Sequence, residues 1–133
     1  MKKLILLCFA AALSSTANAF SGAELLGQCK DFEEIIKGGE TNLKQTLQAG
    51  LCGGYVLGVQ EGFIASSELS DIISEDLGIK SVERNYWDVP PDVTDEQIVH
   101  IVVRYLEINP DMQKQPAVLS VINALRQTYP YKR

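Results

Sequence analysis

The stretch from Gly50 to Gly62 reads GLCGGYVLGVQEG and holds five glycines in thirteen residues. Each glycine destabilises a helix by about 1 kcal/mol relative to alanine, yet the apolar residues here keep the spacing of a helix. The stretch follows neither the GxGxxG pattern of a dinucleotide site nor the Gly-Lys-Ser/Thr ending of a phosphate loop. Gln60 and Glu61 interrupt its apolar character too soon for a membrane span. We therefore expect a helix in which glycine serves close packing.

Four of the glycines recur at every fourth position, which places them on one stripe of a helix. A stripe without side chains lets another backbone approach closely. The sequence leaves two alternatives open: a tight helix crossing within the fold, or a contact between two copies of the chain. The residues concerned are Gly50, Gly54, Gly58 and Gly62.

Two helices joined by a glycine turn are predicted around this stretch. The first begins with a capping box, Ser21 to Glu24, and ends at Gly38-Gly39. The second is predicted from about Asn42 to Phe63, and the pair should form an antiparallel hairpin. The apolar residues that we expect to face the core from the second helix are Leu43, Leu47, Leu51, Tyr55, Val59 and Phe63.

The rest of the chain adds further helices and one long loop. A short amphipathic helix is predicted over Ser67 to Leu77, and a loop without helical period follows from Ile79 to Val93. A capping box, Thr94 to Gln97, opens another helix. A turn then starts at Asn109-Pro110, and a last helix runs from Pro116 to Pro130. We predict an all-α fold, a small bundle of four main helices plus one short helix.

The N-terminus has the three parts of a secretory signal peptide. Met1 to Lys3 is basic, Leu4 to Leu13 is apolar, and Ala17-Asn18-Ala19 is a small-x-small cleavage signal. We therefore expect a signal peptide over residues 1–19 and a single domain over residues 20–133. Cleavage would remove two of the 12 basic residues and none of the 17 acidic ones, which leaves a net charge of −7. Such a charge argues against binding to nucleic acid or to an anionic membrane.

Two cysteines, Cys29 and Cys52, remain after cleavage. An even pair in an exported protein is most simply a disulfide. The two lie at similar heights above the glycine turn, roughly 14 and 17 Å at the helical rise, so a bond would join the two helices of the hairpin. With no CxxC motif and a single histidine, His100, the sequence predicts no metal site and no cofactor.

No combination of nucleophile, base and orienting group is identifiable, so we expect a protein that is not an enzyme. The long loop is the candidate for function, because two large aromatic residues stand there among charged ones. Two interpretations remain open: the aromatic pair forms a binding surface, or Trp87 folds back over the core. The candidate contact residues are Glu83, Arg84, Tyr86, Trp87 and Asp88.

Four segments, in this order, resemble the Rap/Tai family of immunity proteins, which neutralise type VI secretion amidase effectors. The resemblance implies a periplasmic helical protein, often a homodimer, that binds a papain-like peptidoglycan amidase. It also implies that the loop between the third and fourth helices, here Ile79 to Val93, helps to obstruct the active-site cleft of that amidase. The segments are FSGAELLGQC (residues 20–29), CGGYVLGVQEG (52–62), PPDVTDEQIVHIVVRYLEINPD (90–111) and PAVLSVINALRQTYP (116–130).

The chain departs from the family in one respect. Relatives often carry a second cysteine pair, and the corresponding places here hold about Asp88 and Tyr131. We therefore expect the loop to have lost its tie to the C-terminus. A different class, a small periplasmic chaperone or stress protein, is the alternative function, although one histidine offers little for a switch near pH 6.

Overall fold

The computed structural model describes residues 19–79 and 87–131, and within them the chain is all-α as predicted. The helices are α2 (Gly22–Ile36), α3 (Leu43–Asp76), α4 (Asp95–Ile108), the 3₁₀ helix η1 (Pro110–Lys114) and α5 (Ala117–Thr128). All but one residue of the expected signal peptide lies outside the described residues. None of the helices in the described ranges is long and apolar enough to cross a membrane.

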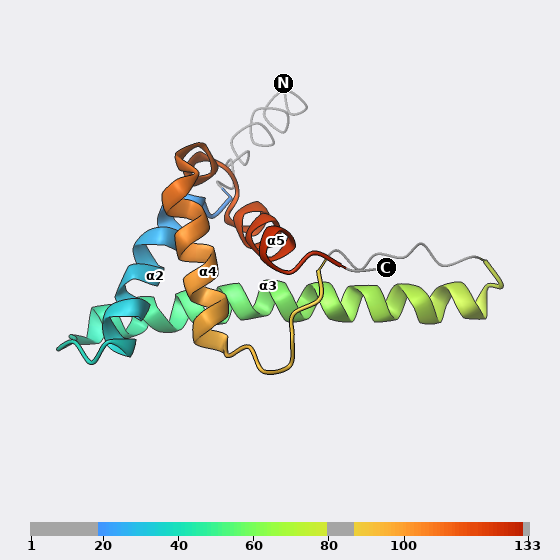
Figure 1. The fold of residues 1–133 in the computed structure, drawn as a ribbon, viewed down its shortest axis with the longest axis horizontal. Helices are drawn as coiled ribbons and strands as arrows, with labels where there is room; N and C mark the ends of the chain where they lie inside the picture. Colours follow the sequence, from blue (N-terminus) through green and yellow to red (C-terminus); the bar gives the residue numbers. More distant parts are fainter. Residues whose placement is uncertain (1–18, 80–86, 132–133) are drawn as a thin grey trace, which may run out of the picture.

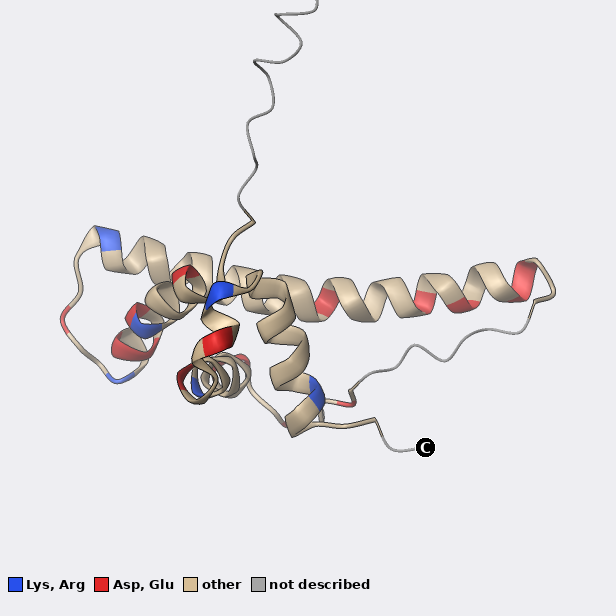
Figure 2. Ribbon diagram, turned by 90° about the horizontal axis from the view of Figure 1, so that it is seen from above, with Lys and Arg blue, Asp and Glu red and all other residues tan. Residues whose placement is uncertain are grey.

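Helix α3 is the axis on which the other helices assemble. Helices α2, α4 and α5 all contact α3, and they gather along its N-terminal half (Figure 1). The C-terminal half of α3 projects beyond them, as two perpendicular views agree (Figures 1 and 2). The molecule is therefore a compact helical bundle with a helical arm.

The start of α2 is fixed by the predicted capping box. The backbone N–H of Ser21 donates to Glu24 Oε2 over 2.8 Å, and the N–H of Glu24 donates to Ser21 Oγ over 3.3 Å. The backbone and side-chain hydrogen bonds from Ser21 lower the pKa of Glu24 below its ordinary value, because both favour the charged carboxylate. A second predicted box, Thr94 with Gln97, opens α4 in the same way.

Gly22 lets the start of α2 lie directly against η1. A Cβ at this position would stand 2.5 Å from the carbonyl oxygen of Met112, closer than any side chain can approach. The two segments are also hydrogen-bonded, since Gly22 N–H donates to the carbonyl of Gln115 over 2.9 Å. Nearby, Ala117 N–H donates to the carbonyl of Phe20 over 2.8 Å. The N-terminus of the domain is thereby joined to the start of α5.

One helix stands where we predicted two. The segment from Ser67 to Leu77 is not a separate short helix but the continuation of α3, which runs unbroken for 34 residues. No glycine or proline interrupts residues 63–77. The serines there are compatible with a helix because their hydroxyls donate to carbonyls one turn earlier, Ser67 to Phe63 over 3.2 Å and Ser74 to Ser70 over 2.8 Å.

The predicted inward face of α3 was wrong for the part of the helix before Cys52. Leu43, Leu47 and Leu51 are 86%, 62% and 51% exposed. The buried face carries Cys52 and Val56 instead, on the opposite side of the helix. Farther along, the predicted inward residues do pack partly against the core: Tyr55, Val59 and Phe63. Burial raises the pKa of the Tyr55 hydroxyl above its ordinary value.

The predicted disulfide between Cys29 and Cys52 is present and lies in the core. The two Cα atoms are 5.0 Å apart, and both residues are fully buried. The bond joins α2 to α3 at the point where α4 and α5 also pack. The fully buried side chains around it include Leu25, Val56, Val99, Val102, Leu106, Val121 and Leu125.

Removing this bond should destabilise the fold. Replacing both cysteines by alanine is expected to lower the free energy of unfolding by about 3 kcal/mol, because the unfolded chain is no longer closed into a loop. Urea denaturation followed by circular dichroism measures the difference. Residues 20–133 contain no other cysteine, so the double variant of this domain should not respond to dithiothreitol, whereas the parent domain should lose stability to the level of the variant. Equal midpoints for oxidised and reduced parent would contradict a stabilising role.

Candidate functional site

The structure places two of the five predicted contact residues. Trp87 and Asp88 begin the second described range, while Glu83, Arg84 and Tyr86 lie outside the described residues. Trp87 is only 8% exposed, and its ring centroid is 4.5 Å from that of Phe63 on α3. Of the two interpretations left open by the sequence, the structure shows the one in which Trp87 covers the core. Asp88, the next residue, is exposed.

The returning end of the loop is tied to the C-terminus, contrary to expectation. Trp87 and Pro130 form an isolated antiparallel bridge, and Asp88 N–H donates to the carbonyl of Tyr129 over 2.9 Å. The family's second cysteine pair corresponds to about Asp88 and Tyr131. Backbone hydrogen bonding thus holds the segment at Trp87 and Asp88 to the segment at Tyr129 and Pro130.

A recess of about 440 Å³ opens beside this bridge, and we call it the loop recess. Its walls come from α3, from the segment that follows Trp87, from the start of α4 and from the C-terminal segment. It contains two carboxylates and one amide, from Asp88, Asp95 and Gln60, beside aromatic and aliphatic side chains. The other residues that line it are Ile64, Trp87, Val89, Pro90, Pro91, Val93, Ile98 and Tyr131.

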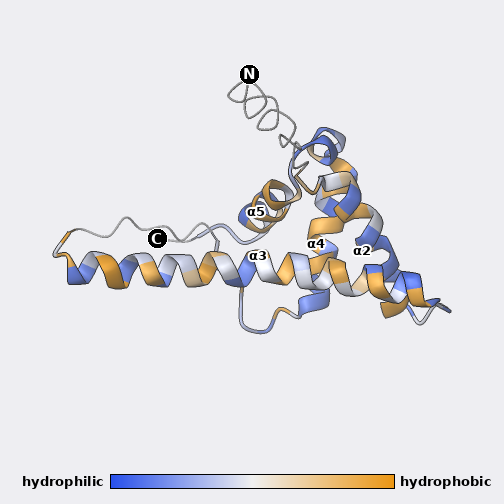
Figure 3. Ribbon diagram, turned by 180° about the vertical axis from the view of Figure 1, so that it is seen from behind, coloured by the Kyte–Doolittle hydropathy of each residue, from blue (hydrophilic) through white to orange (hydrophobic). Residues whose placement is uncertain are grey.

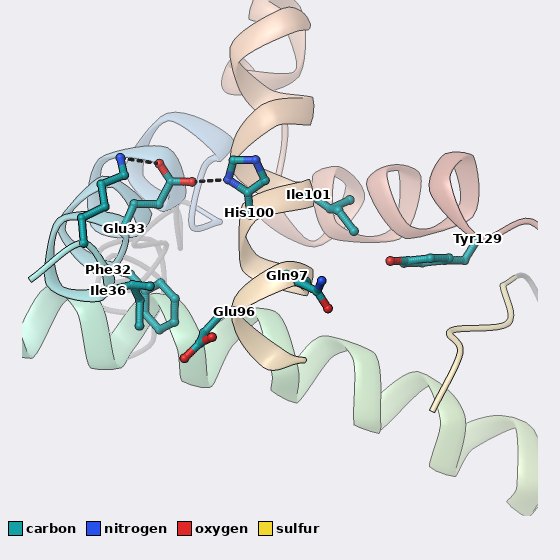
Figure 4. Close-up of a pocket in the computed structure, with 9 residues that line it drawn as sticks. Phe32, Glu33, Ile36, Glu96, Gln97, His100, Ile101 and Tyr129 are labelled. Carbon is teal, nitrogen blue, oxygen red and sulfur yellow. Dashed lines mark hydrogen bonds and ion pairs between the residues drawn. The ribbon is translucent and has the colours of Figure 1, made fainter. Parts of the chain in front are cut away.

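A second concave site, of about 430 Å³, lies between α2 and α4, and we call it the α2–α4 groove (Figure 4). One edge is polar: His100 Nδ1 is 2.7 Å from Glu33 Oε1, and Lys37 Nζ is 3.8 Å from Glu33 Oε2. Phe32, Ile36, Ile101 and Tyr129 provide the apolar surface. Sequence reasoning did not find this groove, because its residues come from α2, α4 and the end of α5 and follow no common spacing.

The α2–α4 groove has the composition of a binding surface. Its histidine and carboxylate are paired, but none of the residues that line it is a serine, threonine or cysteine that could act as a nucleophile. Nor do the described ranges contain a group of three or more metal-ligating side chains. That the chain holds no metal or cofactor stays a prediction.

The glycine stripe of α3 lies on the exposed side of the helix. At Gly50, Gly54, Gly58 and Gly62, a Cβ would meet no described atom within 4 Å. A tight crossing at this stripe is therefore not found within the described part of the fold. The exposed Leu43, Leu47 and Leu51 lie on the same face, since the two sets interleave at helical spacing. Figure 3 shows that hydrophobic residues continue along the projecting half of α3. We call this surface the outer face of α3.

Trp87 should matter for stability because its ring is buried. Replacing Trp87 by alanine is expected to lower the free energy of unfolding by about 3 kcal/mol, through lost burial and the cavity left against Phe63. Denaturation followed by far-ultraviolet circular dichroism measures this without relying on indole fluorescence. The matched variant Trp87→Phe keeps an aromatic ring at the site and should lose clearly less. An unchanged midpoint for Trp87→Ala would contradict a core role.

The comparisons with known proteins agree with the resemblance seen in the sequence. The sequence profile of the Rap1a immunity proteins matches residues 21–131, a range that contains every described helix. No curated protein and no solved structure matches the chain. Because the match extends over most of the chain, it shows the family: this protein belongs to the Rap1a immunity proteins.

Proposed function

We propose that this chain is a periplasmic immunity protein that binds and inhibits a peptidoglycan amidase effector of a type VI secretion system. The match to the Rap1a family over residues 21–131 is the observation that carries this proposal. The protein acts by binding rather than by catalysis, and it protects the producing cell from amidase delivered by its sisters. The signal peptide over residues 1–19 directs it to the compartment that contains the substrate of the amidase, and the buried Cys29–Cys52 disulfide suits that oxidising compartment.

Inhibition in this proposal is steric. The loop from Ile79 to Val93 obstructs the active-site cleft, so that peptidoglycan cannot reach the nucleophile. The geometry at the end of the loop supports such a role, because Trp87 packs on α3 and Asp88 is hydrogen-bonded to Tyr129. A loop held at its base presents its contacts at a lower entropic cost on binding. The proposed contact residues remain Glu83, Arg84, Tyr86, Trp87 and Asp88, with Trp87 acting mainly by holding the loop.

The same proposal includes a homodimer formed through the outer face of α3. That face exposes three leucines beside a stripe of four glycines, and no described part of the chain covers it. Leucines exposed to water favour burial, and glycine lets two helix backbones approach closely. These observations support a contact between two copies and not a crossing within one.

Inhibition can be tested with purified components. The mature chain should abolish cleavage of peptidoglycan by the amidase encoded beside it, at about equimolar ratio, and the two proteins should co-elute in size-exclusion chromatography. An unrelated cell-wall amidase serves as the control and should keep its activity. Undiminished cleavage by the neighbouring amidase at excess inhibitor would refute the proposal. Broad protection of unfolded proteins from aggregation would favour the chaperone alternative.

The dimer can be tested with Gly54→Ala, which should stabilise a single copy but weaken a dimer packed through the outer face of α3. Gly54→Ala places its methyl group in open space in a single copy, so the monomer should gain up to about 1 kcal/mol of stability. In a closely packed dimer, the same methyl group should push the helices apart and raise the dimer dissociation constant. Sedimentation equilibrium measures the second quantity and thermal denaturation at low concentration the first.

The matched control is Gly27→Ala. Gly27 lies on α2, where a Cβ also meets nothing within 4 Å. This variant should gain stability and leave the dimer unchanged. A monomeric parent, or equal dissociation constants for Gly54→Ala and the parent, would overturn the proposed interface.

A further inference from the structure

We propose that the loop recess binds a cationic side chain of the inhibited protein, with arginine as the preferred residue. The identity of the partner rests on the function proposed above. The chemistry of the recess rests on residues that the structure describes, and it can be tested without the partner.

The first observation is a buried acceptor that lacks a donor. The Oε1 atom of Gln60 is inaccessible to solvent and has no hydrogen-bond partner among the described residues. Buried polar atoms in folded proteins nearly always have a partner, and one without a partner calls for an explanation. Gln60 lines the loop recess, so rotation of its amide toward a donor that enters the recess from another molecule would satisfy this oxygen.

The second observation is negative charge without a cationic side chain beside it. Asp88 and Asp95 also line the recess, and no lysine, arginine or histidine is among the described residues that line it. The ion pairs found in the described part of the chain all involve Glu33 or Glu34, so neither aspartate takes part in one of them. The recess therefore presents two carboxylates to an incoming donor, with the Gln60 amide beside them, and its described lining residues include no cationic donor.

The third observation is the apolar surface beside these acceptors. Trp87, Ile64 and Val93 line the recess, and Tyr131 at its edge is 37% exposed. Long cationic side chains bury their methylene stems on such surface while the charged group reaches acceptors. The planar guanidinium of arginine also carries five N–H donors and stacks on aromatic rings. Arginine therefore matches the recess better than the point charge of lysine.

The other occupants fit less well. A metal ion would need more ligands than two carboxylates, and the described ranges contain no group of three metal-ligating side chains. A second copy of this chain would bring a net charge of the same sign, since the full sequence has 17 acidic and 12 basic residues. A partner with a basic surface is the complementary case.

The recess is also rigid enough to select a side chain. Gln60 lies within α3, and Asp95 is the first residue of α4, directly after the N-cap Thr94. Asp88 is held by the hydrogen bond of its backbone N–H to Tyr129. The three residues thus come from separate segments whose backbones are already held before a partner arrives, which lowers the cost of binding.

The first experiment uses N-acetyl-arginine methylamide as the probe. Trp87 is the only tryptophan, so its indole N–H gives a single NMR resonance at the wall of the recess. The arginine derivative should shift this resonance saturably, and the neutral citrulline derivative, which has nearly the same shape, should not. The shift should be lost in Asp88→Asn/Asp95→Asn and kept in Asp92→Asn, a matched change of an exposed carboxylate that does not line the recess.

Two results would overturn the inference. One is an equal response to arginine and citrulline derivatives, which would mean that charge is not recognised. The other is a response that appears only after Lys132 and Arg133 are removed, which would mean that the recess serves the chain's own C-terminus. Circular dichroism of each variant confirms that it is folded.

The second experiment uses the neighbouring amidase and separates this inference from the proposed function. Asp88→Asn/Asp95→Asn should weaken amidase binding at least about tenfold and reduce its dependence on salt, while Asp92→Asn should bind like the parent. If the amidase is inhibited but the double variant binds equally well, the recess inference fails and the proposed function stands. If the arginine derivative binds as described but no amidase is inhibited, the proposed function fails and the recess chemistry stands.

Discussion

The Cys29–Cys52 bond is the constraint on which the rest of the structure depends. It fixes not only the distance between α2 and α3 but also the rotation of α3 about its own axis. Once Cys52 points into the core, Val56 on the same side must follow, and both are fully buried. Leu43, Leu47 and Leu51 are then turned outward, because the helical repeat places them on the other side. The exposed apolar face of α3 is thus a consequence of the crosslink.

The length of α3 has the second large effect on the architecture. Its 34 residues correspond to about 50 Å, whereas the 15 residues of α2 correspond to about 22 Å. Helices of the length of α2, α4 and α5 can cover only part of such an axis, so the distal half projects (Figure 1). This half is acidic, with Glu61, Glu68, Asp71, Glu75 and Asp76 and no basic residue (Figure 2). The chain returns to the bundle at Trp87, whose ring contacts Phe63 near the middle of the helix.

Local signals in the sequence were reliable where a few neighbouring residues decide the outcome. The capping boxes at Ser21 and Thr94 formed because donor and acceptor are three residues apart and need no help from the rest of the fold. The break predicted before Ser67 did not form. A serine is compatible with the helix there because its hydroxyl donates a hydrogen bond to a carbonyl of the preceding turn. Nothing local distinguished the two apolar faces of α3. The choice between them follows from the crosslink and from packing against α4 and α5, which are distant in sequence.

The candidate sites were harder to predict for the same reason. Tryptophan in a polar loop is compatible with either a binding surface or a core contact, and only the position of Phe63 decides for the core. The polar edge of the α2–α4 groove is formed by His100 and Glu33, which are 67 residues apart in the chain. The loop recess likewise combines Gln60 with Asp88 and Asp95. Such combinations depend on the tertiary arrangement of the helices, which no spacing in a single sequence encodes directly.

The positions of the two proposed surfaces on α3 also make them compatible. Gly58 belongs to the outer face, and Gln60 lines the loop recess two residues later, about 200° farther around the helix. Two copies that meet through their outer faces would therefore leave both recesses open. Dimerisation and capture of a basic partner would then not compete for surface, and each copy in a dimer would be free to bind one partner. One helix can carry both surfaces because it is 34 residues long. The buried crosslink helps to offset the stability that its glycines cost.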